Sequence, residues 1–220
     1  MSDTNFKKIK VIGFDLDQTL YPKSPKIDKA IQEYICGKIA KKFNTDIDTA
    51  ANKFRELYHM QGLGGTTSLI RLGFPPEEAS NAVQEALENA DIAQFLKPNQ
   101  ELIDLLNKLG SKYSLDVITG SNQKNTKTKL VHLNIPLTLF NNIITSDDGS
   151  KSLGTSYKLW LFKYPDFTPE EFLYIGDRPR SDYEVPTGLG INCILVNMEE
   201  SDNFYKCRQL KSILGIASIL

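Results

Sequence analysis

The chain has 220 residues, of which 40% are hydrophobic and 24% are charged, and its 26 basic side chains nearly balance 27 acidic ones. This composition is typical of a globular protein and excludes a protein that is mainly a disordered tail. Because charges of both signs are mixed along the chain, we expect neither a polymeric nucleic acid nor a membrane as a partner.

The first ten residues are polar and basic, and no stretch of about 18 apolar residues occurs anywhere in the chain. We therefore expect a cytoplasmic protein that is neither exported by a signal peptide nor membrane-spanning. A short apolar run over residues 10–14 follows, too short for a helix, and it predicts a buried strand.

The segment 22–97 separates this first strand from the next one and is far longer than a single crossover requires. Apolar residues recur at helical spacing over residues 27–43 and 47–60, and prolines followed by glutamates at 75–78 are typical of a helix N-terminus. We expect an all-helical insert over 22–97, with residues 1–21 and 98–220 forming the core. The glycine-rich stretch 62–67 lacks the order of a nucleotide-binding loop and is interpreted as a turn.

Short apolar runs recur after the insert, each followed by polar residues or glycine. They predict strands at residues 115–118, 142–145, 172–175 and 193–196. Helical periodicity occupies the segments between, at residues 100–109, 125–133, 156–164 and 183–189. This alternation predicts an α/β fold with a doubly wound, Rossmann-like parallel sheet.

Cysteine and histidine offer little chemistry in this chain. The three cysteines, Cys36, Cys193 and Cys207, are odd in number and widely spaced, which gives neither a disulfide framework nor a paired metal site. We expect free thiols in a reducing compartment. With only two histidines, the chemistry must rest mostly on carboxylates.

Acidic motifs directly follow two of the predicted strands. Asp15 and Asp17 follow the first strand, and the alternation of an extended chain places both carboxylates on one side. Asp177 and Asp182, in Gly-Asp-Arg-Pro-Arg-Ser-Asp, follow the strand at 172–175. Ligands of doubly wound sheets bind beyond the carboxyl ends of strands, so we expect these acids in one crevice. The alternative is that Asp and Gly merely form turns there.

Converging carboxylates repel one another unless a cation neutralises them. An all-oxygen ligand set selects a hard cation, and Mg²⁺ is the predicted cofactor. Such a site without His or Cys suits a small phosphorylated substrate, because charge neutralisation is the main requirement of phosphoryl transfer.

These residues resemble the motifs of the haloacid dehalogenase superfamily of phosphohydrolases. The resemblance rests on Asp-Leu-Asp-Gln-Thr-Leu at 15–20, a hydrophobic strand ending at Thr119, a following lysine, and Gly-Asp at 176–177 with Asp182. The insert lies where that superfamily carries its helical C1 cap. Within the superfamily, Leu-Tyr-Pro at 20–22 and residues 56–63 look most like the pyrimidine 5′-nucleotidase branch.

The resemblance implies a role for each motif residue. Asp15 would be the nucleophile that forms an aspartyl phosphate, and Asp17 would be the general acid and then the general base. Thr119 would hydrogen-bond the phosphoryl oxygens. Asp177 would bind Mg²⁺ with Asp15 and the main-chain carbonyl of Asp17, and Asp182 would bind the metal through water or orient the lysine.

Two motifs depart from the family pattern. The second reads Thr-Gly-Ser-Asn at 119–122, where relatives place Asn directly after Thr, so Ser121 or Asn122 could share the contact of Thr119. The third lacks the usual Lys-Pro, and its lysine is either Lys151, before the predicted helix, or Lys158, in its first turn. We favour Lys151, and a solvated surface lysine is the alternative explanation for either.

The expected function is Mg²⁺-dependent hydrolysis of a small phosphomonoester, with a nucleoside 5′-monophosphate as the substrate. Two alternatives use the same fold. One is a sugar-phosphate mutase or phosphoglycolate-type phosphatase, and the other is an inactive regulatory or binding protein. Because all four acids of the motifs are intact, the sequence favours an enzyme. Tyr58 and Gln61 in the insert are candidates for substrate contact.

Overall fold

The computed structural model describes residues 6–60, 64–89, 92, 95–197 and 207–220. The chain divides into two compact units, of which one comprises Met1–Lys23 and Leu96–Leu220 and the other Ser24–Phe95. The chain therefore leaves the larger unit once, after its first strand, and returns before its second.

A parallel sheet with the strand order β3-β2-β1-β4-β5-β6 forms the centre of the larger unit. Its strands are β1 (Val11–Phe14), β2 (Ser114–Ile118), β3 (Asn142–Ile144), β4 (Phe172–Gly176), β5 (Asn192–Val196) and β6 (Arg208–Leu210). The parallel sheet and its first five strands are confirmed, and β6 is a strand that the sequence did not predict. β1 and β4 are neighbours, with Phe14 opposite Ile175, so the residues after both strands emerge together.

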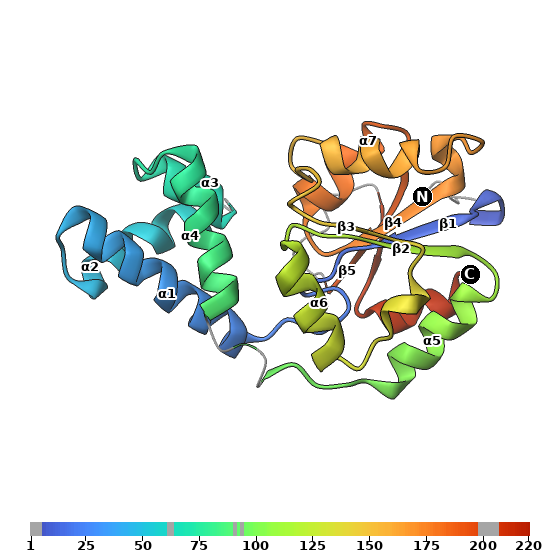
Figure 1. The fold of residues 1–220 in the computed structure, drawn as a ribbon, viewed down its shortest axis with the longest axis horizontal. Helices are drawn as coiled ribbons and strands as arrows, with labels where there is room; N and C mark the ends of the chain where they lie inside the picture. The colour runs from blue at the N-terminus through green and yellow to red at the C-terminus, as the bar shows by residue number, and fades with distance from the viewer. Residues whose placement is uncertain (1–5, 61–63, 90–91, 93–94, 198–206) are drawn as a thin grey trace. The chain divides into compact units, whose positions relative to one another are not determined.

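Helices cover both faces of the sheet, with α7 on one face and α5 and α6 on the other (Figure 1). Their bounds are α5 (Gln100–Gly110), α6 (Gln123–His132), α7 (Thr155–Phe162) and α8 (Val185–Thr187). The helix predicted over 183–189 is wrong in its form, because a π-helical segment, Pro179–Glu184, precedes the short α8. Pro186 has no N–H to donate to an earlier carbonyl, which interrupts a regular α-helix.

Close packing of α7 on the sheet depends on Gly13 in β1. A Cβ atom added at Gly13 would lie 2.6 Å from Cδ1 of Ile118 and 2.7 Å from the ring of Trp160. Glycine therefore leaves the space that the indole ring of α7 fills. Trp160 in turn packs edge-on against Phe172 of β4, at 4.9 Å between ring centroids, as aromatic pairs prefer.

Asp116 in β2 is a buried carboxylate that ties α7 and β3 to the sheet. Its Oδ2 accepts hydrogen bonds from Nε1 of Trp160 at 2.8 Å and from the hydroxyl of Tyr164 at 2.7 Å. Its Oδ1 accepts from the backbone N of Asn142 at 2.6 Å and from Nδ2 of the same residue at 3.0 Å. The carboxylate thus accepts from donors in two segments that are distant from it in the sequence, the region of α7 and the start of β3.

Asp116→Ala is expected to lower the free energy of unfolding by about 3 kcal/mol, because each buried donor that loses its acceptor costs about 1–3 kcal/mol. Asp116→Asn keeps one acceptor oxygen and should cost less. Urea unfolding measures both changes. The control is Asp104→Ala on the exposed face of α5, which should stay within about 0.5 kcal/mol of the wild type. Equal losses at the two positions would contradict the proposed role of Asp116.

The smaller unit contains the helices α1 (Pro25–Phe43), α2 (Ile47–Arg55), α3 (Gly65–Arg71) and α4 (Pro76–Asn89), with a π-helical segment, Glu56–Met60, after α2. Side chains of all four helices share one core, which includes Ile39, Phe54, Leu69 and Ala86. The turn predicted over 62–67 is wrong in part, since Gly65 begins α3 and residues 61–63 lie outside the described ones. Tyr58 stacks on Phe54, at 5.2 Å between ring centroids.

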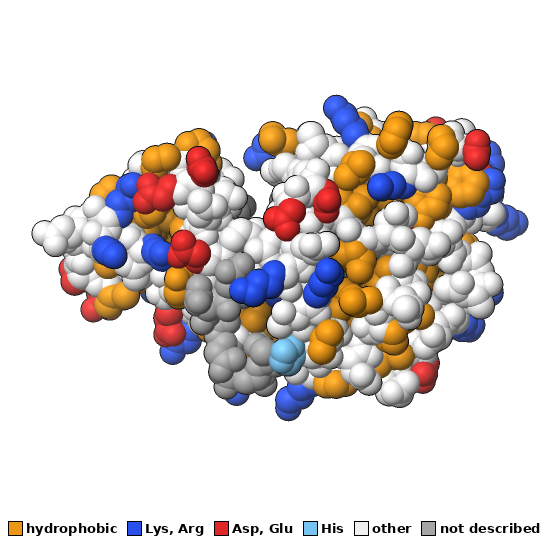
Figure 2. Space-filling view, in the orientation of Figure 1, with side chains coloured by type: hydrophobic (Ala, Val, Ile, Leu, Met, Phe, Trp, Pro, Cys, Tyr) orange, Lys and Arg blue, Asp and Glu red, His pale blue; other side chains and the backbone are white. Residues whose placement is uncertain are grey.

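Side chains of both signs are interspersed on the face of the molecule drawn in Figure 2. The three cysteines are free thiols, as predicted. Within the described part of the chain, none of the helices combines the length and the apolar character needed to span a bilayer.

Candidate active site

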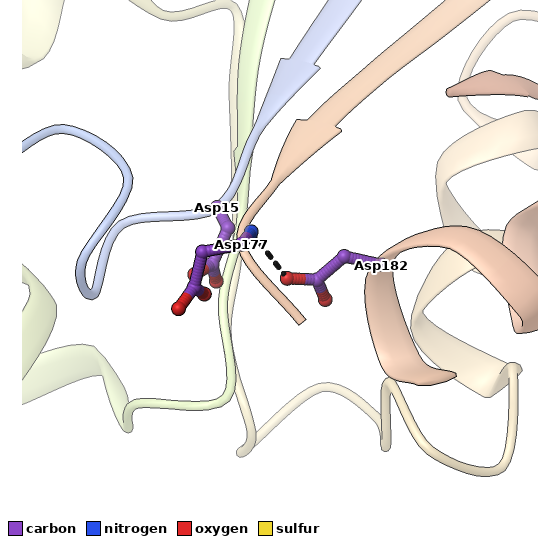
Figure 3. Close-up of side chains that lie close together, drawn as sticks. All are labelled: Asp15, Asp177 and Asp182. Carbon is purple, nitrogen blue, oxygen red and sulfur yellow. Dashed lines mark hydrogen bonds between the residues drawn. The ribbon is translucent and has the colours of Figure 1, made fainter. Parts of the chain in front are cut away.

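Three buried carboxylates meet at the carboxyl ends of the two central strands. Asp15 follows β1, and its backbone N donates to the carbonyl of Ile175 in β4 at 2.8 Å. Asp177 follows β4, and Asp182 lies in the π-helical segment after it. Carboxylate oxygens of the three residues lie within 4.8 Å of one another. Figure 3 shows Asp15 and Asp177 pointing the same way from neighbouring strand ends, whereas Asp182 turns toward the backbone of Asp177.

Asp182 is held by the loop that it closes. Its Oδ2 accepts from the backbone N of Asp177 at 3.1 Å and of Arg178 at 3.0 Å, and its Oδ1 accepts from Oγ of Ser181 at 2.8 Å. A Cβ atom at Gly176 would lie only 2.4 Å from the Oδ2 atom of Asp182, so this close approach requires glycine. These contacts favour a role in orienting the site over direct metal ligation.

Lys151, in the turn before α7, is the cation within this cluster. Its Nζ lies 2.6 Å from Oδ1 of Asp15 and 2.8 Å from Oδ1 of Asp182. Burial alone would lower the pKa of Lys151, but the charges of the two carboxylates outweigh burial and raise it. Lys158, the other candidate, is exposed on α7, and the contacts described for the cluster do not include it. The structure therefore brings Lys151 to the site and leaves Lys158 at the surface.

Burial and the neighbouring charges shift the pKa values of all three acids in the cluster. Burial raises the pKa of Asp15 to about 7, with Lys151 acting against the rise and the other acids adding to it. Burial likewise raises the pKa of Asp177 to about 6. For Asp182, Lys151 and the hydrogen bonds of the loop overcome burial and lower the pKa.

These features fit a divalent cation held by Asp15 and Asp177. When ionised, the three carboxylates and one lysine of the cluster leave a charge of −2, which one divalent cation neutralises. Oδ1 of Asp177 is buried and has no hydrogen-bond partner among the described residues, and a buried carboxylate oxygen without a partner is costly unless a cation binds it. Since all the ligand atoms are oxygens, Mg²⁺ suits the set.

The side chain of Asp17 is not part of that metal-binding group, because other donors hold it. Oδ1 of Asp17 accepts from the hydroxyl of Tyr21 at 2.6 Å and from Nζ of Lys129 at 2.5 Å, and Oδ2 accepts from Oγ of Ser121 at 2.7 Å. Burial would raise the pKa of Asp17, but the charge of Lys129 and these hydrogen bonds hold the pKa below its ordinary value.

The second motif lies at the same edge of the sheet. Thr119 is buried directly after β2, and its Oγ1 accepts from the backbone N of Ser121 at 3.1 Å. Of the two residues that could share its contact, Ser121 touches Asp17, whereas Asn122 caps α6 by accepting from the N of Asn125 at 2.9 Å.

Sequence reasoning missed Lys129, which lies in α6 and is buried. The helical spacing of the sequence could have indicated that Lys129 is buried. Position 129 shares a helix face with Thr126, Leu130 and Leu133, all of which are buried. A lysine on an otherwise buried face indicates a buried partner of opposite charge.

Asp15 and Asp177 follow adjacent parallel strands, and the buried Lys151 contacts Asp15 and Asp182. The site therefore defines an α/β protein whose chemistry rests on carboxylates, with a helical segment between its first and second strands. Residues 12–196 match the family model described as haloacid dehalogenase-like hydrolase. The chain belongs to this family, which confirms the superfamily that the motifs indicated.

Among known proteins, the chain is similar to the glyceraldehyde 3-phosphate phosphatase of Methanopyrus kandleri, with 26% identity over 182 residues, covering 79% of this chain and 78% of the relative. A hydrolase of the haloacid dehalogenase-like family from Streptococcus pneumoniae has a similar structure, with a TM-score of 0.69, 22% identity, and coverage of 96% of this chain and 98% of that one. The HAD-hydrolase YfnB of Bacillus subtilis, in a structure bound to magnesium, gives a TM-score of 0.59 at 14% identity, with coverage of 97% and 98%. At these identities the two structures support the fold.

Proposed function

We propose that this hydrolase is a cytoplasmic, Mg²⁺-dependent phosphatase of small phosphomonoesters that works through an aspartyl phosphate on Asp15. The observation that carries the proposal is the state of the Asp15 carboxylate. Its Oδ1 is held by Lys151 at 2.6 Å, whereas its Oδ2 has only a 3.5 Å contact with Oγ1 of Thr19 among the described hydrogen bonds. One oxygen is therefore fixed and the other is free to attack phosphorus.

Asp17 would move the protons of the reaction. In the first half, an oxygen of Asp15 forms a bond to phosphorus, the ester bond breaks, and Asp17 gives its proton to the leaving oxygen. In the second half, water attacks phosphorus, Asp17 takes the proton of that water, and the bond to Asp15 breaks. The contacts with Lys129 and Ser121 favour the carboxylate form of Asp17, which is the form that the second half uses. For the first turnover, Asp17 must therefore take up one proton from solvent or from the phosphomonoester monoanion before the ester bond breaks, and in later turnovers the attacking water supplies that proton.

The remaining residues would bind and neutralise the phosphoryl group. Lys151 lies against Asp15 and would offset the charge that approaches it. Thr119, buried after the neighbouring strand, would donate its hydroxyl to a phosphoryl oxygen. Asp15 and Asp177 would hold Mg²⁺, which when bound neutralises negative charge between nucleophile and substrate.

For the substrate, we propose a nucleoside 5′-monophosphate, which rests on the resemblance of residues 20–22 and 56–63 to the pyrimidine 5′-nucleotidase branch. Gln61 in that stretch lies outside the described residues. We infer that the helical unit Ser24–Phe95 acts as the cap that selects the substrate and excludes water. Glyceraldehyde 3-phosphate is a second candidate, favoured by the 26% identical phosphatase of Methanopyrus kandleri.

A phosphate-release screen tests this function. The purified protein is offered nucleoside 5′-monophosphates, sugar phosphates including glyceraldehyde 3-phosphate, and phosphoglycolate, with Mg²⁺ or with a chelator. We expect release that requires Mg²⁺ and is fastest for a nucleoside monophosphate. Fastest release from a triose phosphate would favour the second candidate, and phosphate transfer between hydroxyl groups without release would favour a mutase. No reaction with any ester would contradict an enzymatic function and favour a binding protein.

Mg²⁺ is expected to raise the melting temperature of the protein, and the rise should grow from about pH 5 to about pH 8. The pKa of Asp15 is about 7 and that of Asp177 is about 6, so protons occupy these carboxylates at the lower pH. Mg²⁺ must displace those protons, and its affinity therefore increases with pH until both groups are ionised. Thermal unfolding with Mg²⁺ and with a chelator measures the difference. Asp177→Asn is the control variant and should reduce the shift at both pH values; a wild-type shift independent of pH would contradict the assignment.

A further inference from the structure

Lys129 is a buried lysine that is paired with Asp17 and not with a member of the cluster of Asp15, Asp177 and Asp182 in the described ion pairs. Only 3% of its side chain is exposed, and burying an ammonium group is costly unless it is paired and hydrogen-bonded. Its position in α6 places it on the helix face that packs on the sheet, beside Thr126 and Leu130. The site residues of the family motifs do not account for this lysine.

The contacts of Lys129 form a closed ring with Asp17 and Ser121. Its Nζ lies 2.5 Å from Oδ1 of Asp17 and 2.9 Å from Oγ of Ser121, and Oγ of Ser121 lies 2.7 Å from Oδ2 of Asp17. Both oxygens of the Asp17 carboxylate are therefore held by the same pair of residues. The ring fixes the plane of the carboxylate and joins the loop after β1 to the turn after β2 and to α6.

The described contacts of Lys129 reach Asp17 and Ser121, whereas those of Lys151 reach Asp15 and Asp182. The two buried lysines thus have different partners. Lys151 is paired with Asp15, the proposed nucleophile, and Lys129 is paired with Asp17, the residue proposed to transfer the proton. An effect of Lys129 on catalysis would pass through Asp17, since no hydrogen bond or ion pair among the described residues joins Lys129 to Asp15 or Asp177.

We propose that Lys129 is a positioning residue which, together with Ser121, holds the carboxyl group of Asp17 in the orientation needed for proton transfer. In that orientation, Asp17 can reach first the leaving oxygen and then the attacking water. The inference rests on the proposed function. Asp17 gives its proton to the leaving oxygen as the ester bond breaks, and it recovers a proton from water as the bond from phosphorus to Asp15 breaks. Lys129 binds the carboxylate that remains once the proton of Asp17 has passed to the leaving oxygen.

This role predicts which reactions depend on Lys129. An alkyl ester needs a proton on its leaving oxygen, so the release of its alcohol requires a correctly placed Asp17. The leaving group of p-nitrophenyl phosphate is stable as an anion and needs no proton. Loss of Lys129 should therefore slow the first release of an alkyl alcohol but not that of nitrophenol, and it should change kcat more than KM.

The test is a double-mutant cycle with Lys129→Met, Asp17→Asn and the variant that carries both changes. The probes are p-nitrophenyl phosphate and the alkyl phosphomonoester that the wild-type protein hydrolyses fastest, each followed through the first turnover with enzyme in excess. We expect Lys129→Met to slow alcohol release from the alkyl ester about 10–100-fold, which is no more than the lower end of the roughly 10²–10⁴-fold contribution of a general acid, because Asp17 is still present but misplaced. Release of nitrophenol and the value of KM should each change less than about threefold, and Lys129→Met should add less than about twofold to Asp17→Asn.

Matched variants separate positioning from a loss of charge or fold. Lys127→Met removes the same charge from an exposed position of α6 and should leave both rates unchanged. Lys129→Arg keeps a buried cation and should restore most of the rate with the alkyl ester. If Lys129→Met does not fold, Lys129→Gln, which retains a hydrogen-bond donor, takes its place in the cycle.

Two results would overturn the inference while leaving the proposed function intact. They are an equal slowing of both esters, and a full additional loss when Lys129→Met is combined with Asp17→Asn. Failure of the proposed function is recognised separately, because the wild-type protein would then release no phosphate in the presence of Mg²⁺, and the role of Lys129 would fall with it.

Discussion

Asp15→Asn is expected to abolish Mg²⁺-dependent phosphate release, with a loss of at least about 10⁴-fold, as for the removal of other catalytic nucleophiles. The amide is nearly the same size as the carboxylate but cannot form the bond to phosphorus. The variant also lacks one of the two carboxylates expected to hold Mg²⁺. Both effects act on the same step, and neither Lys151 nor Asp17 can replace the missing nucleophile.

The same substitution should leave the fold intact. Asp15 is buried and its pKa is raised to about 7, so at about pH 8 its charge costs free energy in the metal-free protein. A neutral amide removes this cost and can still accept a hydrogen bond from Lys151. We expect the free energy of unfolding without Mg²⁺ to fall by less than about 1 kcal/mol.

Phosphate release and urea unfolding of the same preparation test both expectations for Asp15→Asn. Asp166→Asn is the control, since Asp166 is exposed and should affect neither measurement. Turnover of Asp15→Asn at the wild-type rate would end the proposal that Asp15 is the nucleophile. If Asp15→Asn loses both turnover and folding, the nucleophile is tested in the wild-type protein instead, by labelling it with a substrate that carries radioactive phosphate. Absence of a labelled phosphoenzyme would count against Asp15 as the nucleophile.

The central strands could be predicted because they are buried on both sides and are therefore continuous apolar runs. β6 escaped prediction because it is an edge strand of three residues, Arg208–Leu210, with only partial burial and no apolar run. The helix α3 escaped because it begins with Gly65, and glycine favours turns in a sequence taken alone. In both places, tertiary packing decides the structure and local propensity does not.

The positions of the acids in the site could be predicted because they depend on the ends of adjacent strands. The partners of Asp17 could not, because the contact between Asp17 and Lys129 joins residues 112 positions apart and depends on how α6 packs on the sheet. The choice between Lys151 and Lys158 similarly depends on the exact start of α7 at Thr155, which turns position 158 to solvent. Motif spacing restricts the candidates for such contacts, and helix packing selects among them.

Lys151→Met is expected to affect both activity and stability, because this lysine is the buried cation between Asp15 and Asp182. Removing one partner of a buried ion pair costs about 3–5 kcal/mol, and loss of the charge that offsets the phosphoryl group should slow turnover at least about 10²-fold. The loss of stability in the metal-free variant should shrink as the pH falls from about 8 to about 5, since protons then neutralise carboxylates whose wild-type pKa values are about 7 and about 6. Urea unfolding across this pH range and phosphate release measure the two effects.

The control is Lys158→Met, at an exposed position, which should change the free energy of unfolding by less than about 0.5 kcal/mol. Greater loss of turnover in Lys158→Met than in Lys151→Met would reverse the assignment of the two lysines.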